Sequence, residues 1–135
     1  MIKTLQIAAP GQGLHPFTSE VKALAKEADL DQGLCTLFIQ HTSASLIIQE
    51  NYDPSAQYDL ERWINRLVPE RDSLYTHTLE GDDDMPAHIK SVLTATSLSI
   101  PIIDGQLALG TWQGIYLWEH RRSANTRTVI AHLSV

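Results

Sequence analysis

The chain has 135 residues, with 16 acidic and 10 basic side chains and a formal net charge of −6. A chain of this length is expected to form one domain, residues 1–135, which buries about two-thirds of the surface of the unfolded chain. The acidic balance argues against nucleic-acid and anionic-membrane partners, because both are bound through basic surface. Local binding of a phosphorylated small molecule stays compatible with this charge.

Cysteine content and hydropathy bear on location. Cys35 is the only cysteine, so the chain can form no internal disulfide, which fits an intracellular protein. No run of about 20 apolar residues predicts a membrane span, and the first residues lack the apolar core of a signal peptide. We therefore expect a cytoplasmic protein that does not bind membranes.

The first third of the sequence predicts a strand and then a helix. Residues 2–8 have strand character, and Gly11 and Gly13 indicate a turn. Thr18 or Ser19 is expected to cap the helix that follows. The apolar residues of this helix have the spacing of a buried stripe, and they are Val21, Leu24, Ala25 and Ala28.

The central part predicts two strands and a second helix. Residues 34–41 form the stronger strand and residues 46–49 the shorter one. Alternate residues share one face of the stronger strand, namely Cys35, Leu37, Ile39 and His41. The pair Asp53-Pro54 predicts a helix start, because aspartate caps helices and proline suits the first turn. That helix should end at Pro69, and its apolar side chains are Leu60, Trp63, Ile64 and Leu67.

The last third is rich in strand patterns. Strands are predicted over 97–103, 106–109, 114–120 and 127–133, and Asp104-Gly105 predicts a tight hairpin turn between the first two. The late strands have no helices between them, which disfavours a doubly wound parallel sheet. The pattern predicts an α+β domain built around an antiparallel sheet or sandwich, with two or three helices.

His41 ends the first strong strand on its apolar face and opens the run HTSAS. A polar ring that points with a core face needs a partner, since an unpaired buried polar group is costly. Two interpretations are open. His41 is either a core histidine bonded to a backbone carbonyl or a ligand-binding residue beside small hydroxyl side chains.

The stretch GDDDMPAHIK, residues 81–90, combines a helix start with candidate ligands. If Pro86 begins the helix, Asp84 lies near the N-cap and His88 follows one turn later. The side chains expected to face inward are Ile89, Val92 and Leu93. Capping would explain Asp84 but not His88 or the two preceding aspartates. Oxygen donors suit Mg²⁺ and imidazoles suit Zn²⁺, so a divalent metal ion is an attractive ligand here.

His77 and Glu119 are two further candidates. His77 precedes His88 by eleven positions, and the two rings could converge on one ion or point apart. Glu119 shares the inward strand face of Ile115 and Leu117, so its carboxylate should be paired or functional. A raised pKa of Glu119 would suit a general base.

The run LGTWQGI, residues 109–115, places glycines on both sides of Trp112 and Gln113. Glycine within a strand often marks a bulge or a close backbone approach. Trp112 is either a core aromatic or a stacking platform for a heteroaromatic ring. Gln113 could hydrogen-bond the edge of such a ring.

Five segments stand in order through nearly the whole chain: HTSASL at 41–46, EN at 50–51 with DP at 53–54, EGDDDMPAHIK at 80–90, LGTWQGI at 109–115 and EHR at 119–121. Together these segments resemble the YjbQ-type family, the secondary thiamine-phosphate synthases. By family position, the matched site residues are His41, Asn51, Asp59, His77, His88, Gln113 and Glu119.

The resemblance implies an α+β fold with an antiparallel, jelly-roll-like β-sandwich that assembles as a homotrimer. It also implies thiamine-phosphate synthase activity, in which a pyrimidine diphosphate is joined to a thiazole phosphate and pyrophosphate is released. Displacing pyrophosphate requires charge neutralisation on the leaving group. Our hypothesis is therefore that His41, His77 and His88 gather around one divalent ion, Mg²⁺ or Zn²⁺, or around a phosphate.

The remaining candidate residues receive roles on the same basis. Glu119 is expected to be a general base or to orient another residue, and the other catalytic candidates are His41, His88 and Asp59. The candidate substrate-binding residues are Asn51, Trp112, Gln113, Lys90 and Arg121. For Lys90 and Arg121 the alternative to a phosphate contact is a surface salt bridge. Two rival functions are a metal-dependent hydrolase of a small phosphorylated substrate and a non-catalytic small-molecule-binding trimer.

Overall fold

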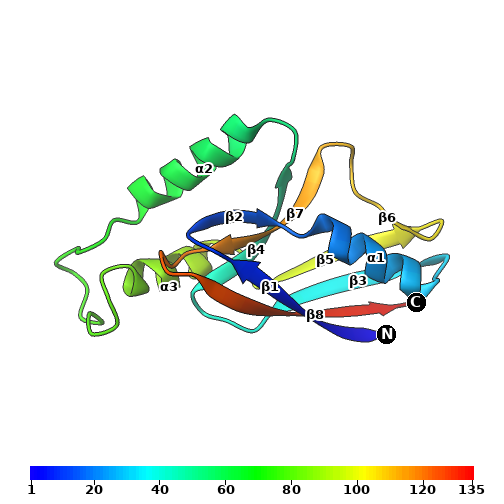
Figure 1. Ribbon diagram of the computed structural model, residues 1–135, viewed down its shortest axis with the longest axis horizontal. Helices are drawn as coiled ribbons and strands as arrows, with labels where there is room; N and C mark the ends of the chain where they lie inside the picture. The colour runs from blue at the N-terminus through cyan, green and yellow to red at the C-terminus, as the bar shows by residue number, and fades with distance from the viewer.

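The computed structural model describes all of residues 1–135 and contains eight strands and three helices (Figure 1). The strands are β1 (Ile2–Ala9), β2 (Gly13–Pro16), β3 (Gln32–Ile39), β4 (Ala44–Glu50), β5 (Ser97–Ile103), β6 (Gln106–Leu107), β7 (Gln113–Glu119) and β8 (Asn125–Ser134). The helices are α1 (Thr18–Ala28), α2 (Pro54–Leu67) and α3 (Asp84–Leu93).

The strands form two antiparallel sheets, with strand orders β1-β8-β3-β5-β6 and β2-β7-β4. Alternate residues of β3, β7 and β8 point into the space between the sheets and make one large apolar core. The face of Cys35, Leu37 and Ile39 is fully buried, as its alternation predicts. Val21, Leu24 and Ala25 of α1 join the same core. The expected α+β class with an antiparallel β-sandwich is confirmed.

The start of α1 differs from the prediction. Phe17 occupies the N-cap position, and no side chain caps the helix. The hydroxyl of Thr18 instead accepts a hydrogen bond of 2.8 Å from the backbone N–H of Ile115 in β7. The predicted cap at Thr18 or Ser19 is therefore wrong. The N–H of Ile115 takes the hydroxyl oxygen that a cap would need. Thr18 therefore joins the first turn of α1 to the smaller sheet.

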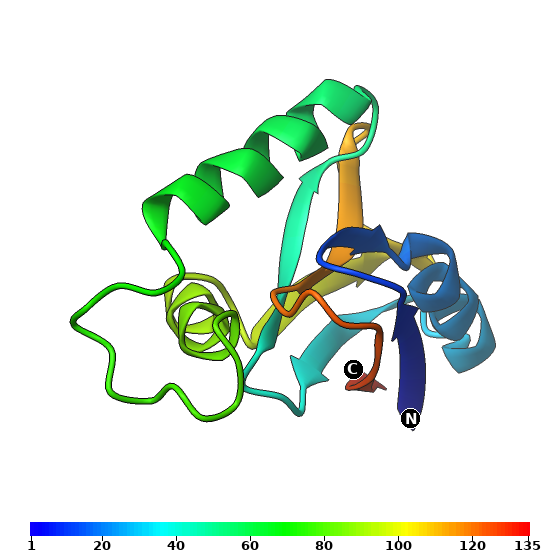
Figure 2. The ribbon, with the colours of Figure 1, turned by 60° about the vertical axis from the view of Figure 1, so that its left-hand side comes forward.

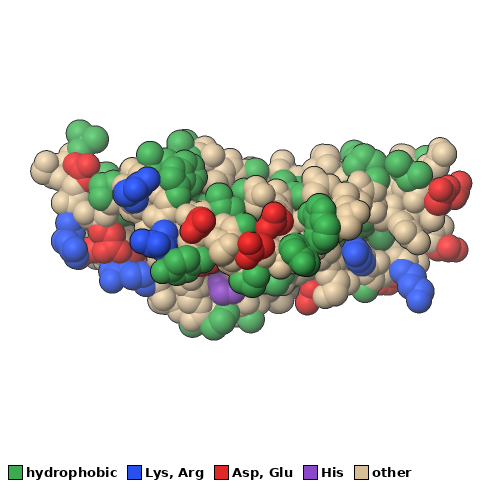
Figure 3. All heavy atoms as spheres, turned by 90° about the horizontal axis from the view of Figure 1, so that it is seen from above, with side chains coloured by type: hydrophobic (Ala, Val, Ile, Leu, Met, Phe, Trp, Pro, Cys, Tyr) green, Lys and Arg blue, Asp and Glu red, His purple; other side chains and the backbone are tan.

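Helix α2 begins as predicted but buries little. Asp53 Oδ1 accepts from the N–H of Ser55 at 2.9 Å, and Pro54 occupies the first turn. Of the four apolar side chains on this helix, only Ile64 is buried, whereas Trp63 and Leu67 are exposed. Figure 3 looks onto the side where α2 lies in Figure 1 and shows hydrophobic side chains among charged ones at the surface. Helix α2 therefore leaves Trp63 and Leu67 at the surface.

Helix α3 turns a different face inward from the one expected. It begins at Asp84, two residues before Pro86. Val92 and Leu93 are 82% and 56% exposed, so the prediction that they face inward is wrong. The buried side chains are Asp84, Pro86, Ala87, Lys90 and Ser91. Polar residues can occupy this face because each finds a partner there, as Ser91 Oγ does by donating to the carbonyl of Ala44.

Turn chemistry and strand limits follow the sequence with small shifts. Asp104 and Gly105 have φ angles of 52° and 78°, which is the left-handed pair that a tight hairpin requires. Strand β6 is two residues long and shorter than predicted, and β2 was not predicted because it is brief and bounded by glycine. Strand β3 ends at Ile39, so His41 lies in the loop before β4. None of the three helices combines the length and apolar character needed to cross a bilayer.

Candidate metal centre

The carboxylate of Asp84 lies at the start of α3 but does not cap the helix. Asp83 holds the N-cap position, and no side-chain cap bond forms. Asp84 is 2% exposed, and its Oδ2 lies 2.7 Å from His77 Nε2 and 3.1 Å from His88 Nε2. The predicted capping role is wrong, because the carboxylate points away from the helix backbone and toward the two imidazoles.

His88 is held in one orientation by the backbone. Its Nδ1 donates to the carbonyl of Thr42 at 3.0 Å, and a carbonyl can only accept, so Nδ1 carries the hydrogen. In the neutral ring Nε2 is then an acceptor, and it faces a carboxylate oxygen of Asp84 that is also an acceptor. A second proton on His88 or a cation must therefore lie between these two atoms.

The three side chains are close enough together to hold a metal ion. One ligand atom each from His77, Asp84 and His88 lies within 4.8 Å of the others, and the two imidazole rings are 5.4 Å apart. Asp84 is buried, His88 is half-buried and His77 is exposed, so the group opens toward solvent. Two imidazoles and one carboxylate suit Zn²⁺ and neighbouring transition metals better than Mg²⁺, which prefers oxygen ligands.

Arg121 anchors the acidic side of this group. Its Nη1 donates to Asp84 Oδ1 at 2.7 Å and its Nε to Asp83 Oδ2 at 3.1 Å. Burial alone would raise the pKa of Asp84, but the hydrogen bond from His77 and the nearby charges of His88 and Arg121 hold that pKa below its ordinary value. Hydrogen bonding to Asp83 raises the pKa of Arg121. Asp84 is therefore ionised, and the Arg121 guanidinium is already bound to two carboxylates.

Glu119 points inward, as predicted, and is paired. It is fully buried between the sheets, and both of its oxygens accept from the guanidinium of Arg127, with Arg127 Nε at 2.8 Å from Oε1. Its Oε2 also accepts from the backbone N–H of Arg121 at 3.1 Å. Sequence reasoning missed Arg127, although its alternation with Val129 and Ala131 on β8 places it on the inward face.

The structure brings His77 and His88 together but does not bring His41 to them. His41 Nε2 accepts from the backbone N–H of Thr128 at 2.8 Å, where a bond to a backbone carbonyl was one expectation. Burial and the adjacent Arg127 guanidinium lower the pKa of His41. His41 is consequently a neutral imidazole beside the Glu119–Arg127 pair. The third member of the group with His77 and His88 is Asp84, where the sequence predicted His41.

Lys90 lies on the buried face of α3 and not at the surface. It is 3% exposed, and its Nζ donates to Asn65 Oδ1 of α2 at 2.6 Å. Burial lowers the pKa of this ammonium group. The predicted surface position of Lys90 is therefore wrong, and so is a role as an accessible phosphate contact in this conformation. Its contact joins α3 to α2.

His120 lies in the motif at residues 119–121 but received no predicted role, and it is buried beside Lys90. Its Nε2 bonds to Ser45 Oγ at 2.8 Å, while its Nδ1 is buried with no partner. A small cavity of about 30 Å³ borders both His120 and Lys90. Burial, together with the charges of Lys90 and Arg127, lowers the pKa of His120 to about 3. The ring is therefore neutral at physiological pH.

The candidate substrate residues Asn51, Trp112 and Gln113 lie away from the histidines. Thr42, which bonds His88, precedes β4, and Asn51 follows it. The seven residues of β4 span roughly 20 Å. Within one chain, His88 and Asn51 therefore lie too far apart to contact the same small ligand. Trp112 is 56% exposed and packs on Tyr52 with ring centroids 4.7 Å apart, which rules out a core role. Asp59 is exposed on α2, apart from both groups.

The chain has close relatives among known proteins. The family described as UPF0047 protein YjbQ-like matches residues 3–135. UPF0047 protein sll1880 of Synechocystis is 54% identical over 96% of this chain and 88% of its own. UPF0047 protein YjbQ of Escherichia coli O157:H7 is 46% identical over 97% of this chain and 95% of its own.

Solved structures agree with this assignment. The conserved hypothetical protein TT1486 from Thermus thermophilus superimposes with a TM-score of 0.86 at 32% identity, over 98% of this chain and 99% of its own. A YjbQ/UPF0047 protein from Clostridium acetobutylicum gives the same TM-score and identity, over 99% of both chains. With sequence and fold matched along nearly the full length, this chain belongs to the YjbQ-like UPF0047 family.

Proposed function

We propose that this chain is a metal-dependent enzyme acting on a small phosphorylated molecule, with the ion held by His77, Asp84 and His88. The observation that carries the proposal is the contact between His88 Nε2 and Asp84 Oδ2. With the neutral ring these two acceptors lie 3.1 Å apart, and either a second proton on His88 or a metal ion between them would remove the repulsion. Three protein ligands with an open side are typical of catalytic zinc sites.

Groups around the ligands support the same assignment. The carbonyl of Thr42 fixes the tautomer of His88 that presents a lone pair to the site. Arg121 binds the other oxygen of Asp84 and so fixes the carboxylate. Outer partners of this kind orient the ligands of metal sites and increase metal affinity. The ligand set is thus held ready by contacts that would have no evident purpose in a simple helix cap.

The reaction we propose is the transfer implied by the resemblance to thiamine-phosphate synthases, in which pyrophosphate leaves a pyrimidine diphosphate as a thiazole phosphate attaches. A bound ion would neutralise charge on the departing pyrophosphate. A cavity of about 220 Å³ that His77 lines offers a place for the substrate, and Arg71 and Tyr75 line it as well. Arg71 is a candidate phosphate contact there because its guanidinium is largely exposed.

Glu119 enters the proposal as a positioning residue. Its carboxylate is fully buried and paired with Arg127, so a substrate proton is out of its reach in this conformation. The Glu119 carboxylate accepts a hydrogen bond from the backbone N–H of Arg121, and the Arg121 guanidinium donates to Asp84. We infer that Glu119 places Arg121, and through it Asp84, in preference to acting as a general base.

The test uses the purified protein after chelator treatment and reloading with Zn²⁺, Mn²⁺ or Mg²⁺. Incubation of each form with both thiamine precursors should give coupled product only with a metal present. His88→Ala should lose both metal and product, while His132→Ala, which changes an exposed histidine, should match the native protein. Metal-loaded native protein that makes no more product than His88→Ala would remove the synthase proposal.

A metal-dependent hydrolase is the second candidate, and the open side of the three-ligand group favours it. Such a site leaves a coordination position for water. Incubation of the same protein forms with p-nitrophenyl phosphate separates the two functions. Metal-dependent release of nitrophenol without coupled thiamine product would select the hydrolase, and tight phosphate binding without turnover of either substrate would select a non-catalytic binding protein.

A homotrimeric assembly belongs to the same proposal. Tyr58, Trp63 and Leu67 leave apolar surface on α2 exposed, and exposed apolar side chains grouped on one element often mark a protein interface. Light scattering after size-exclusion chromatography should give three times the 15.1 kDa mass of the chain. A mass of one chain at micromolar concentration would contradict the trimer.

A further inference from the structure

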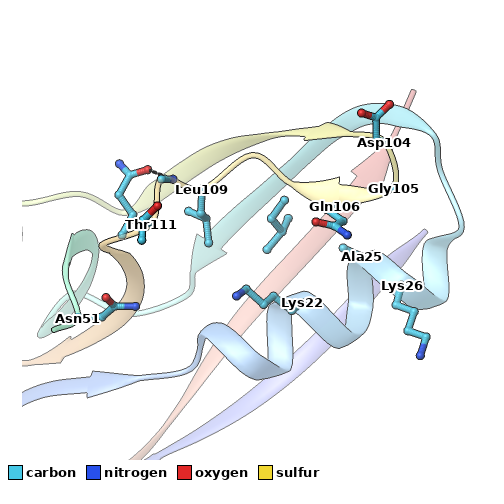
Figure 4. Close-up of a pocket in the computed structure, with 12 residues that line it drawn as sticks. Lys22, Ala25, Lys26, Asn51, Asp104, Gly105, Gln106, Leu109 and Thr111 are labelled. Atoms are coloured by element: carbon cyan, nitrogen blue, oxygen red, sulfur yellow. Dashed lines mark hydrogen bonds between the residues drawn. The ribbon is translucent and has the colours of Figure 1, made fainter.

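A larger cavity lies at the opposite end of the molecule from the metal centre. It has a volume of about 580 Å³ and lies between α1 and the chain from β6 to β7 (Figure 4). Small-molecule sites usually enclose about 300–1,000 Å³. Figure 1 shows α3 at one end of the fold and α1 with β6 at the other, so this cavity is separate from the His77–Asp84–His88 group.

The cavity presents a cation and an amide without protein partners. Lys22 of α1 and Asn51 at the end of β4 both line it, and Figure 4 shows their polar ends reaching toward one another across the space. Both side chains are exposed to solvent, and neither forms an ion pair or a side-chain hydrogen bond with the protein, although the chain has a net charge of −6 with 16 acidic side chains. An ammonium group left unpaired in an acidic protein is suited to an anionic ligand.

The remaining charges do not cancel this preference. Lys26, one turn after Lys22 on α1, also borders the cavity, and its side chain points away from the space in Figure 4. The single carboxylate in the lining is Asp104, which sits on the hairpin turn and points outward in Figure 4. The Lys22 and Asn51 end of the cavity therefore offers N–H donors and no negative charge.

The other side of the cavity has a fixed shape and an apolar floor. Gln113 Oε1 accepts from the backbone N–H of Gly110 at 2.7 Å, which closes the turn at residues 110–113. Leu107 is buried and Leu109 is partly buried against the core, so both are held in place. Apolar side chains beside a few polar donors are the usual composition of an organic-ligand site.

We propose that this cavity binds a small organic phosphate. Lys22 and Asn51 receive the phosphate group, and Leu107 and Leu109 contact the carbon skeleton. Asn51 thereby has a ligand at a place separate from the histidines. It does not depend on the metal centre.

Inorganic phosphate and phenyl phosphate are suitable probes, followed by ¹H–¹⁵N NMR on the metal-free protein. Both should shift the amide resonances of Gly105 and Gly110 in a saturable way, and phenyl phosphate should bind more tightly because its ring meets the leucines. Lys22→Gln should weaken binding about fivefold to tenfold, as expected for one partly exposed charge-assisted bond. Asn51→Asp should abolish it by charge repulsion.

The matched control is Lys3→Gln, which removes the same charge from a surface lysine paired with Glu27. It should leave the affinity of both probes unchanged, and so should His88→Ala. If Lys22→Gln and Lys3→Gln weakened phosphate binding equally, the loss would reflect only the net charge of the protein, and the proposal would be overturned. Shifts confined to Gly81, beside the histidines, would overturn it too, while leaving the proposed enzyme function untouched.

Discussion

His88 Nε2 lies 3.1 Å from Asp84 Oδ2, one helical turn away on α3. The His88 Nδ1 hydrogen is already donated to the Thr42 carbonyl, so the contact joins two acceptors unless a positive group separates them. Figure 2 shows the connection between α2 and α3, which carries His77, passing beside α3. The α2–α3 connection, which supplies His77, and helix α3, which supplies Asp84 and His88, thus make one ligand group.

The first prediction concerns the charge of Asp84. Replacement by asparagine keeps the shape but removes the anionic ligand, so zinc affinity should fall at least about tenfold. Competition with a chromogenic chelator measures this directly. The control is Asp82→Asn, which alters an exposed aspartate bonded to Arg71 and should leave affinity unchanged. Native affinity in Asp84→Asn would mean that no ion binds at this group.

The second prediction concerns the buried pair of Glu119 and Arg127. Glu119→Gln leaves the guanidinium buried without its counter-charge and should lower the free energy of unfolding by about 3–5 kcal/mol. The surface variant Glu27→Gln, which loses only the exposed contact with Lys3, should cost less than about 1 kcal/mol. Urea unfolding compares the two. A similar small loss in both would show that the buried pair contributes little.

The third prediction follows from His120, whose pKa burial lowers to about 3. The unfolded chain takes up a proton below about pH 6.5 and the folded chain does not, so unfolding is favoured as the pH falls. Stability from the neutral ring is complete above about pH 6.5 and should decline by about 1.4 kcal/mol per pH unit toward about pH 3. Urea unfolding between about pH 7 and pH 4 checks this slope.

Variants separate the contribution of His120 from that of other groups. His120→Gln removes the titrating ring and should flatten the pH dependence of unfolding in that range. His132→Gln alters an exposed histidine of β8 and should leave the native slope. If the free energy of unfolding depended on pH equally in His120→Gln and in the native protein, groups other than His120 would cause that dependence.

The fourth prediction concerns the attachment of α1. Thr18→Val keeps the side-chain shape but leaves the N–H of Ile115 without its acceptor, and this should cost about 1–3 kcal/mol. Thr18→Ser should restore most of the loss because the oxygen returns. Ser19→Ala should be nearly neutral, since the Ser19 hydroxyl contacts only the exposed Glu20. A larger effect at Ser19 than at Thr18 would favour a helix cap.

Local chemistry in the sequence decided much of the fold. The alternation of Cys35, Leu37 and Ile39 marks a core strand because side chains alternate across any strand. Asp53 caps α2, and Asp104-Gly105 turns the β5–β6 hairpin, because both depend on backbone groups only a few residues away. The family resemblance was also readable from the sequence, because it depends on ordered motifs alone.

The tertiary structure alone decided the direction of the polar side chains. Asp84 could have capped α3, but Arg121 and two histidines offered its carboxylate stronger partners. Lys90 is buried because Asn65 of another helix meets it. Asn51 and His88 are separated because β4 runs between their neighbours. Each outcome depends on contacts between distant segments, which exist only after the two sheets have packed together.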